Sequence, residues 1–356
     1  MRFVIFLSAV ALHAQQAPNC PGFQNCLYTP VSETEFVGQT IPITYDDVTG
    51  TERTFEVYVR VPNVRGKMPV AIWAHGGGEG RSEGGPSVFS RPSSLTAGAG
   101  YLSITPAFRA RTPEQMKPLC EFLGATTEQL CGVINSTMWD RPYDIQAIIR
   151  LLRRENAREE SPLFGRVDME RIAVGGHSAG STGTLSVAGA YREFVDKRYG
   201  GTDYFEDPTP IAFVALSPSA PGDSNLFDTG YKNAQTSWDK ITRPVLILSG
   251  EGDSHMQFPH GRRIGYDYLP EADGTHYRFW FNDVDFGHGQ FGEDPCELPG
   301  AAGKRKCDVF LDAWSSLILS YLDGYVLKNQ RALDYLNNGY ATRITPPSFT
   351  IEMSRK

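Results

Sequence analysis

Apolar and polar positions along the chain follow the periods of strands and helices in turn. The stretches Thr40–Tyr45 and Arg53–Val61 alternate in polarity and predict an antiparallel hairpin. Met68–Ala74 is almost continuously apolar, as in a strand buried on both faces of a parallel sheet. Apolar residues at helical spacing predict a helix over Asp140–Asn156. Further strands are expected at Tyr101–Pro106, Ile211–Leu216, Pro244–Leu248 and Thr275–Phe281, and further helices at Ser93–Gly98, Ser181–Ala190, Thr236–Ile241, Gly261–Tyr268 and Val309–Leu327.

Strands alternate with helices, and no internal repeat or linker interrupts them. This order predicts one α/β domain over residues 36–356, with a mostly parallel central sheet and helices on both faces. The two leading strands are expected to form an antiparallel edge. Residues 109–138 show no clear period and follow a strand, on the side where such sheets place ligand loops. We expect this insertion to form a wall or partial lid of a site.

Composition and charge narrow the range of partners. The chain has 356 residues, 40% of them hydrophobic, which is enough for one large core. The formal net charge is −7, and acidic and basic residues are interspersed without a basic block. Both features argue against a nucleic-acid partner.

The first residues have the features of a secretory signal. Met1-Arg2 supplies a short positive start, and Phe3–Leu12 supplies an apolar stretch too short to span a bilayer. We therefore expect residues 1–14 to be a signal peptide and 15–35 to be an N-terminal arm. No later segment is apolar and long enough to cross a membrane, so the mature protein is expected to be secreted or periplasmic.

Six cysteines occur as three pairs that are close in sequence. The pairs favour local disulfides Cys20–Cys26, Cys120–Cys131 and Cys296–Cys307, in agreement with export, although sequence alone does not fix the connectivity. Buried free thiols are the alternative. No C-x-x-C spacing with a nearby histidine indicates a metal site, and no cofactor is expected.

The strongest chemical signal is the segment Gly176-His177-Ser178-Ala179-Gly180, which follows an apolar run and precedes a helix of small residues. This is the G-x-S-x-G nucleophile elbow, in which a serine sits at the apex of a sharp strand-to-helix turn. A tight turn with a buried structural serine is the alternative. A second glycine-rich turn, His75-Gly76-Gly77-Gly78, lies upstream and favours the catalytic interpretation.

In chain order, His75–Gly78, the elbow, Gly250–Asp253 and Gly287–Gly289 make the sequence resemble an α/β-hydrolase. More narrowly, it is similar to exported bacterial esterases of the dienelactone-hydrolase-like group. The resemblance covers roughly residues 40–330. It implies a serine nucleophile, an acid after a later strand, and a histidine after the last strand.

Ser178 is then the nucleophile, Asp253 the acid and His288 the base. His288 is chosen by elimination. His13 lies in the signal, His75 and His177 belong to the two turns, His276 begins a strand, and His255 and His260 follow the acid loop too closely. Glu251 is the nearest rival acid, and Asp223 or Asp228 could serve as a displaced acid.

The oxyanion formed on attack needs preorganised N–H donors. Ala179 supplies one, and Gly77 and Gly78 are the candidates for the other. Four aromatic residues at or near strand ends could line a substrate pocket or belong to the core: Trp73, Phe108, Trp139 and Phe286.

The expected function is therefore hydrolysis of a small-molecule or polymeric carboxylic ester through an acyl-enzyme. Polyester or lipid hydrolysis, in the manner of a lipase or phospholipase, would use the same fold. A peptidase is less favoured because no large domain precedes the catalytic part. A non-catalytic binding protein is the alternative from another class. A metallohydrolase using Asp253, His255 and His260 would need a ligand spacing that the chain does not show.

Overall fold

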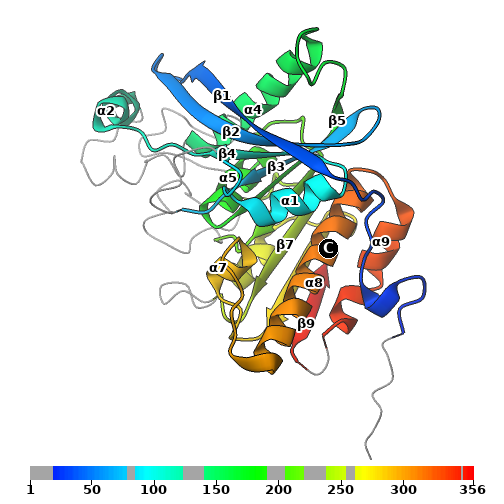
Figure 1. The fold of residues 1–356 in the computed structure, drawn as a ribbon. Helices are drawn as coiled ribbons and strands as arrows, with labels where there is room; N and C mark the ends of the chain where they lie inside the picture. Colours follow the sequence, from blue (N-terminus) through cyan, green and yellow to red (C-terminus); the bar gives the residue numbers. More distant parts are fainter. Residues whose placement is uncertain are drawn as a thin grey trace, which may run out of the picture.

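The computed structural model describes residues 19–77, 85–122, 140–190, 205–219, 238–253, 261–345 and 348–356. Within these ranges the strands form one sheet in the order β1-β2-β4-β3-β5-β6-β7-β8-β9 (Figure 1). The strands are β1 (Phe36–Asp46), β2 (Glu52–Pro62), β3 (Met68–Ala74), β4 (Leu102–Ala107), β5 (Val167–His177), β6 (Ala212–Leu216), β7 (Val245–Gly250), β8 (His276–Asn282) and β9 (Thr350–Arg355).

The middle of the sheet is parallel and its edges are antiparallel. The neighbours from β4 and β3 through to β8 pair in parallel. The hairpin β1–β2 runs antiparallel and joins β4 antiparallel. These pairings confirm the predicted α/β architecture and its antiparallel leading edge. At the other edge, β9 pairs antiparallel with β8, which the sequence analysis did not predict.

Helices connect the strands along most of the chain. The α-helices of the described ranges are α1 (Ser90–Gly98), α2 (Pro113–Phe122), α4 (Asp140–Ala157), α5 (Ala179–Ala188), α6 (Gly261–Ile264), α7 (His288–Phe291), α8 (Gly300–Tyr325) and α9 (Gln330–Asn337), with 3₁₀ turns η1 (Gln24–Cys26), η5 (Gly265–Tyr268) and η6 (Tyr340–Arg343). Three of these helices were not predicted from the sequence: α2, α7 and α9. The helix predicted near residue 238 is wrong for its described part, because residues 238–240 form a turn.

Two hydrophobic cores lie on opposite faces of the sheet. One joins alternate residues of the central strands, such as Ala71 and Val214, to α1, α8 and α9. The other joins the residues between them, such as Val70 and Phe213, to α4 and α5. Figure 1 shows α1 and α8 on one side of the sheet and α4 on the other. This two-sided burial is why the central strands are apolar without alternation.

The N-terminal arm packs against the C-terminal helices. Asp323 on α8 accepts hydrogen bonds from the Tyr28 hydroxyl (2.8 Å), the Tyr101 hydroxyl (2.9 Å) and the Val31 N–H (3.0 Å). The ring of Phe23 meets Tyr335 of α9 edge to face at 5.0 Å. The arm is therefore packed on the folded domain, with Tyr28 in its hydrophobic core.

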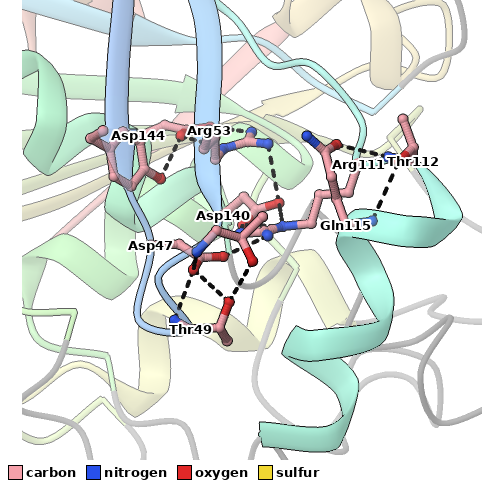
Figure 2. A network of polar contacts seen from close by, with 10 residues as sticks. Asp47, Thr49, Arg53, Arg111, Thr112, Gln115, Asp140 and Asp144 are labelled. Carbon is pink, nitrogen blue, oxygen red and sulfur yellow. Dashed lines mark hydrogen bonds and ion pairs between the residues drawn. The ribbon is translucent and has the colours of Figure 1, made fainter.

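A network of buried charges holds the hairpin against α4 (Figure 2). Arg53 of β2 donates to both carboxylate oxygens of Asp144, at 2.7 and 2.6 Å, and lies 3.4 Å from Asp140. Arg111, in the segment leaving β4, bonds Asp140 at 2.7 Å and reaches Asp47 in the hairpin turn at 2.6 Å. The network thus fixes the first turn of α4 and the beginning of the predicted insertion to the same edge of the sheet.

Two of the predicted disulfides are confirmed. Cys20 pairs with Cys26, with Cα atoms 5.2 Å apart, and Cys296 pairs with Cys307, at 5.6 Å. The third predicted pair includes Cys131, which lies outside the described residues. The bridges fit a protein that folds in an oxidising compartment. Among the helices that the structure describes, none combines the length and apolar character needed to cross a membrane.

Candidate active site

The turn that carries Ser178 is tight and strained. Ser178 joins β5 to α5 with φ 54° and ψ −121°, a backbone conformation that costs a non-glycine residue about 1–3 kcal/mol. A Cβ added to Gly176 would overlap the backbone of Gly180, and one added to Gly180 would overlap the end of β3. The two glycines of the motif are therefore required by close packing at the turn.

Backbone hydrogen bonds hold the elbow at the carboxyl edge of the sheet. The N–H of Ser178 donates to the carbonyl of Leu216 at the end of β6 (3.0 Å), and the Ser178 carbonyl accepts from the N–H of Thr182 (3.1 Å). Ser178 itself stays partly exposed. The N–H groups of the first turn of α5, beginning at Ala179, have no acceptor within the helix. A negative charge beside the serine would meet these donors and the positive end of the helix dipole.

The carboxylate of Asp253 is buried just after β7 and holds a histidine ring. Its Oδ1 accepts a hydrogen bond from Nδ1 of His288 at 2.8 Å, while Asp253 is only 2% exposed. An ionised carboxylate can only accept, so Nδ1 of His288 carries a proton, and in the neutral ring Nε2 is the acceptor. The His288 side chain is 39% exposed, so the ring forms the outer member of this pair.

Three further side chains satisfy the Asp253 carboxylate. Ser249 Oγ donates to Oδ2 at 2.7 Å, and Ser217 Oγ donates to the same oxygen. The Nε of Arg262 forms an ion pair with Oδ1 at 3.0 Å. Burial raises the pKa of Asp253, but the hydrogen bond from His288 and the charge of Arg262 outweigh it, and the pKa lies below its usual range. The carboxylate is therefore ionised at neutral pH.

His177, the variable residue of the elbow motif, holds the backbone that carries His288. Its Nε2 donates to the carbonyl of His288 at 2.8 Å, and the two ring centroids are 4.5 Å apart. Burial first, and then the charge of His288, lower the pKa of His177 to about 3. His177 is therefore neutral. It joins the start of α7 to the end of β5, next to Ser178.

Ser178 directly follows β5, Asp253 follows β7, and His288 begins α7 after β8. The hydrogen bond from His177 to the His288 carbonyl brings the Asp253–His288 pair to the residue that precedes Ser178. Among the described residues, no hydrogen bond joins the Oγ of Ser178 to the Nε2 of His288. A contact of this kind commonly tightens only when substrate binds. The Asp253–His288 half of the predicted arrangement is formed, and the serine lies beside it.

The turn after β3 lies against the elbow. A Cβ added to Gly76 would lie 3.5 Å from the Cβ of Ser178, and Gly77 is exposed. The carbonyl of Gly76 is held by Nδ1 of His75 at 2.7 Å and by Nη2 of Arg141 at 3.0 Å. Gly78, the other candidate donor, lies outside the described residues.

The predicted pocket aromatics divide into core and site. Trp73 is 1% exposed, and its ring covers Gly175 inside the core; Phe286 is fully buried and stacks on Phe310 at 4.2 Å. Neither therefore lines a surface that a substrate could reach. Phe108 is partly buried, and its ring lies 5.1 Å from the ring of His75. Trp139 lies outside the described residues.

Two of the rival residues lie in the described ranges. Glu251 is exposed, unlike Asp253. His276 begins β8, and its Nε2 donates to the carbonyl of Ile241 at 2.9 Å, which is a structural contact. The remaining rivals lie outside the described residues: His13, Asp223, Asp228, His255 and His260.

Sequence reasoning missed Ser217, Ser249, Arg262 and Arg141. The two serines had a usable signal, because each lies at the carboxyl end of a buried strand that neighbours the acid. Arg262 and Arg141 had none, since long side chains reach the site from helices and no spacing rule places them.

No group of three or more histidine, cysteine, aspartate or glutamate side chains in the described ranges is arranged to hold a metal ion. Comparison of the chain with protein-family models gave no match. Comparison with curated proteins gave no match either.

Proposed function

We propose that the protein is a serine hydrolase of the α/β-hydrolase class that cleaves carboxylic esters. The observation that carries the proposal is the buried Asp253 carboxylate, which holds the His288 ring at 2.8 Å beside the strained elbow of Ser178. The chain order serine, aspartate, histidine and the strand–serine–helix turn are those of this class. The mostly parallel sheet with helices on both faces supports the same assignment.

Acylation would begin when Ser178 Oγ attacks the ester carbonyl carbon and its proton passes to Nε2 of His288. Asp253 keeps Nδ1 protonated and stabilises the imidazolium without taking the proton. The tetrahedral oxyanion would be bound by the N–H of Ala179 and by an N–H of the turn after β3. One such donor contributes about 3 kcal/mol of transition-state stabilisation. Collapse of the intermediate releases the alcohol, which takes its proton from His288.

Deacylation repeats these steps with water as the nucleophile. His288 accepts a proton from the water as it attacks the acyl carbon and returns it to Ser178 Oγ when the acid leaves. His288 therefore acts as a base and then as an acid in each half. The Arg262 ion pair and the two serine hydroxyls hold Asp253 in place throughout.

The disulfides and the N-terminal segment support a compartment outside the cytosol. Cys20–Cys26 and Cys296–Cys307 fit a secreted or periplasmic protein. We therefore place the substrate among esters outside the cytosol, such as acylated polysaccharides, lipid esters or polyesters.

The decisive experiment is turnover of p-nitrophenyl acetate by the wild type and by Ser178→Ala. We expect the variant to lose more than about 10³-fold in kcat. Ser186→Ala is the matched control, because Ser186 lies on the same helix and its Oγ bonds only the Thr182 carbonyl in the described structure (2.8 Å). A serine-directed fluorophosphonate should label Ser178 alone. Retained turnover in Ser178→Ala would overturn the proposal. If the variant loses turnover, a series of esters with acyl chains of graded length would rank the substrates.

A further inference from the structure

Arg141 is a buried cation whose guanidinium contacts no carboxylate in the described structure. It stands in the first turn of α4, is 5% exposed, and reaches beneath the turn that follows β3. Nη1 donates to the carbonyl of His75 and Nη2 to the carbonyl of Gly76 at 3.0 Å. The neighbouring Asp144 is taken up by two hydrogen bonds from Arg53.

A buried guanidinium bound mainly to neutral groups is costly, because it has left water without meeting an opposite charge. Burial lowers the pKa of Arg141 to about 9, so the group stays charged at neutral pH. The ring of Phe108 lies 4.4 Å from the guanidinium and covers it. α5 makes room for the side chain at Gly183, where an added Cβ would lie 3.0 Å from the Cβ of Arg141. The side chain of Arg141 is therefore accommodated by the packing of Phe108 and Gly183 around it.

The two carbonyls that Arg141 binds determine where the next N–H groups point. In a trans peptide the C=O and the N–H point in opposite directions. The carbonyl of Gly76 faces the guanidinium and His75, so the N–H of Gly77 is directed to the other side of that peptide. Gly77 is exposed, and Gly76 faces the Cβ of Ser178. The Gly77 N–H thus leaves the buried side of the turn next to the serine.

Glycine alone would not select this orientation. Gly76 and Gly77 lack side chains, so the peptide between them can rotate with little steric resistance. A rotated peptide would place a carbonyl oxygen where a developing negative charge needs a donor. Two donors, Nη2 of Arg141 and Nδ1 of His75, oppose that rotation by holding the Gly76 carbonyl.

We propose that Arg141 is a positioning residue that fixes the Gly76–Gly77 peptide, so that the Gly77 N–H completes the oxyanion hole opposite Ala179. The proposal rests on the proposed serine-hydrolase function. It identifies Gly77, among the glycines of the turn, as the donor. It also explains why the Arg141 charge is buried there, because the guanidinium holds the Gly76 carbonyl. The guanidinium also polarises the peptide that it binds, which makes the Gly77 N–H a stronger donor.

The test is a double-mutant cycle between Arg141→Lys and Gly77→Pro. Lysine keeps the charge but cannot grip two carbonyls in one plane, while proline removes the N–H itself. With p-nitrophenyl acetate, we expect Gly77→Pro to lower kcat about 10²–10³-fold and Arg141→Lys to lower it about 10–10²-fold, with KM little changed. The double variant should be no slower than Gly77→Pro, because both changes remove the same donor.

A matched control isolates the effect. The control is Arg243→Lys. Arg243 also donates to backbone carbonyls, those of Asp207 (2.6 Å) and Pro210 (2.7 Å). It lies just before β7, at the end of the strands opposite the site. The substitution should leave kcat unchanged. A trifluoromethyl ketone that forms a tetrahedral adduct should bind Arg141→Lys more weakly by the same factor as the loss in kcat.

Losses in kcat that multiply in the double variant, or an Arg141→Lys variant as fast as the wild type, would overturn the inference. If Arg141→Lys does not fold, His75→Leu removes the other donor to the Gly76 carbonyl and is tested in the same cycle. Failure of the serine-hydrolase proposal is distinct, because Ser178→Ala would then keep its turnover.

Discussion

Replacing Arg53 by methionine should remove the positive charge at the centre of the network in Figure 2. Arg53 makes two hydrogen bonds to Asp144, at 2.7 and 2.6 Å, and an ion pair with Asp140 at 3.4 Å. In the variant Asp140 keeps Arg111, whereas Asp144 keeps only the Tyr45 hydroxyl at 2.9 Å among the contacts described. The change therefore leaves the buried Asp144 carboxylate without a direct ion pair among these contacts, and the more distant charge of Arg141 compensates it only in part.

The size of the effect follows from this geometry. Breaking a buried pair by removing one partner costs about 3–5 kcal/mol, because the other charge stays out of water. Unfolding entropy is about 2.1 cal/mol/K per residue, so for roughly 340 residues we expect Tm to fall by about 4–7 °C. Burial raises the pKa of Asp144 while the charge of Arg53 opposes that rise. Without Arg53 the carboxyl protonates more readily, so the loss of stability should shrink as the pH falls from 7 to 5.

Urea unfolding of four proteins measures these quantities: the wild type, Arg53→Met, Asp144→Asn and the double variant. The double variant should recover much of the lost free energy of unfolding, because the uncompensated charge is gone. Arg154→Met is the control, since this side chain on α4 is 66% exposed and its pair with Glu155 is worth at most about 1 kcal/mol. The reasoning is refuted if Arg53→Met is no less stable than Arg154→Met, or if its deficit does not change with pH.

Two further predictions concern the acid and a buried histidine. Asp253→Asn should lower kcat for p-nitrophenyl acetate about 10³-fold, because the amide cannot stabilise the imidazolium of His288. Glu251→Gln should retain kcat, and equal losses in the two variants would contradict the assignment of the acid. His276 has its pKa lowered by burial to about 4, below its unfolded value, so it stabilises the fold above pH 6.5 and this contribution is lost toward pH 4. Between pH 6.5 and pH 4, the free energy of unfolding of the wild type should fall by about 3 kcal/mol more than that of His276→Gln. Parallel curves of unfolding free energy against pH would contradict this prediction.

Much of the fold could be predicted because burial on both faces leaves a simple pattern. β3 begins and ends where its apolar run does, at Met68 and Ala74. α2 was missed because it is only ten residues long and includes Pro118. β9 is short and pairs only at an edge, where one face need not be apolar.

The candidate site also contains some residues that the sequence indicates and others that it does not. The contact between Asp253 and His288 could be anticipated because glycines mark turns after buried strands. Trp73 was left open between pocket and core because the sequence does not show that Gly175 on the neighbouring strand accepts its ring. Arg141 and Arg262 act through long side chains from other elements, and only the folded structure brings them to the turn after β3 and to Asp253.

The bonds to Asp323 have a consequence for how the molecule is assembled. They join Tyr28 and Val31, which are among the first residues of the folded part to be synthesised, to a helix made almost 300 positions later. One side of the interior therefore cannot close until nearly the whole polypeptide has been made. A chain that completes its packing so late stays open along this side until its synthesis is almost finished.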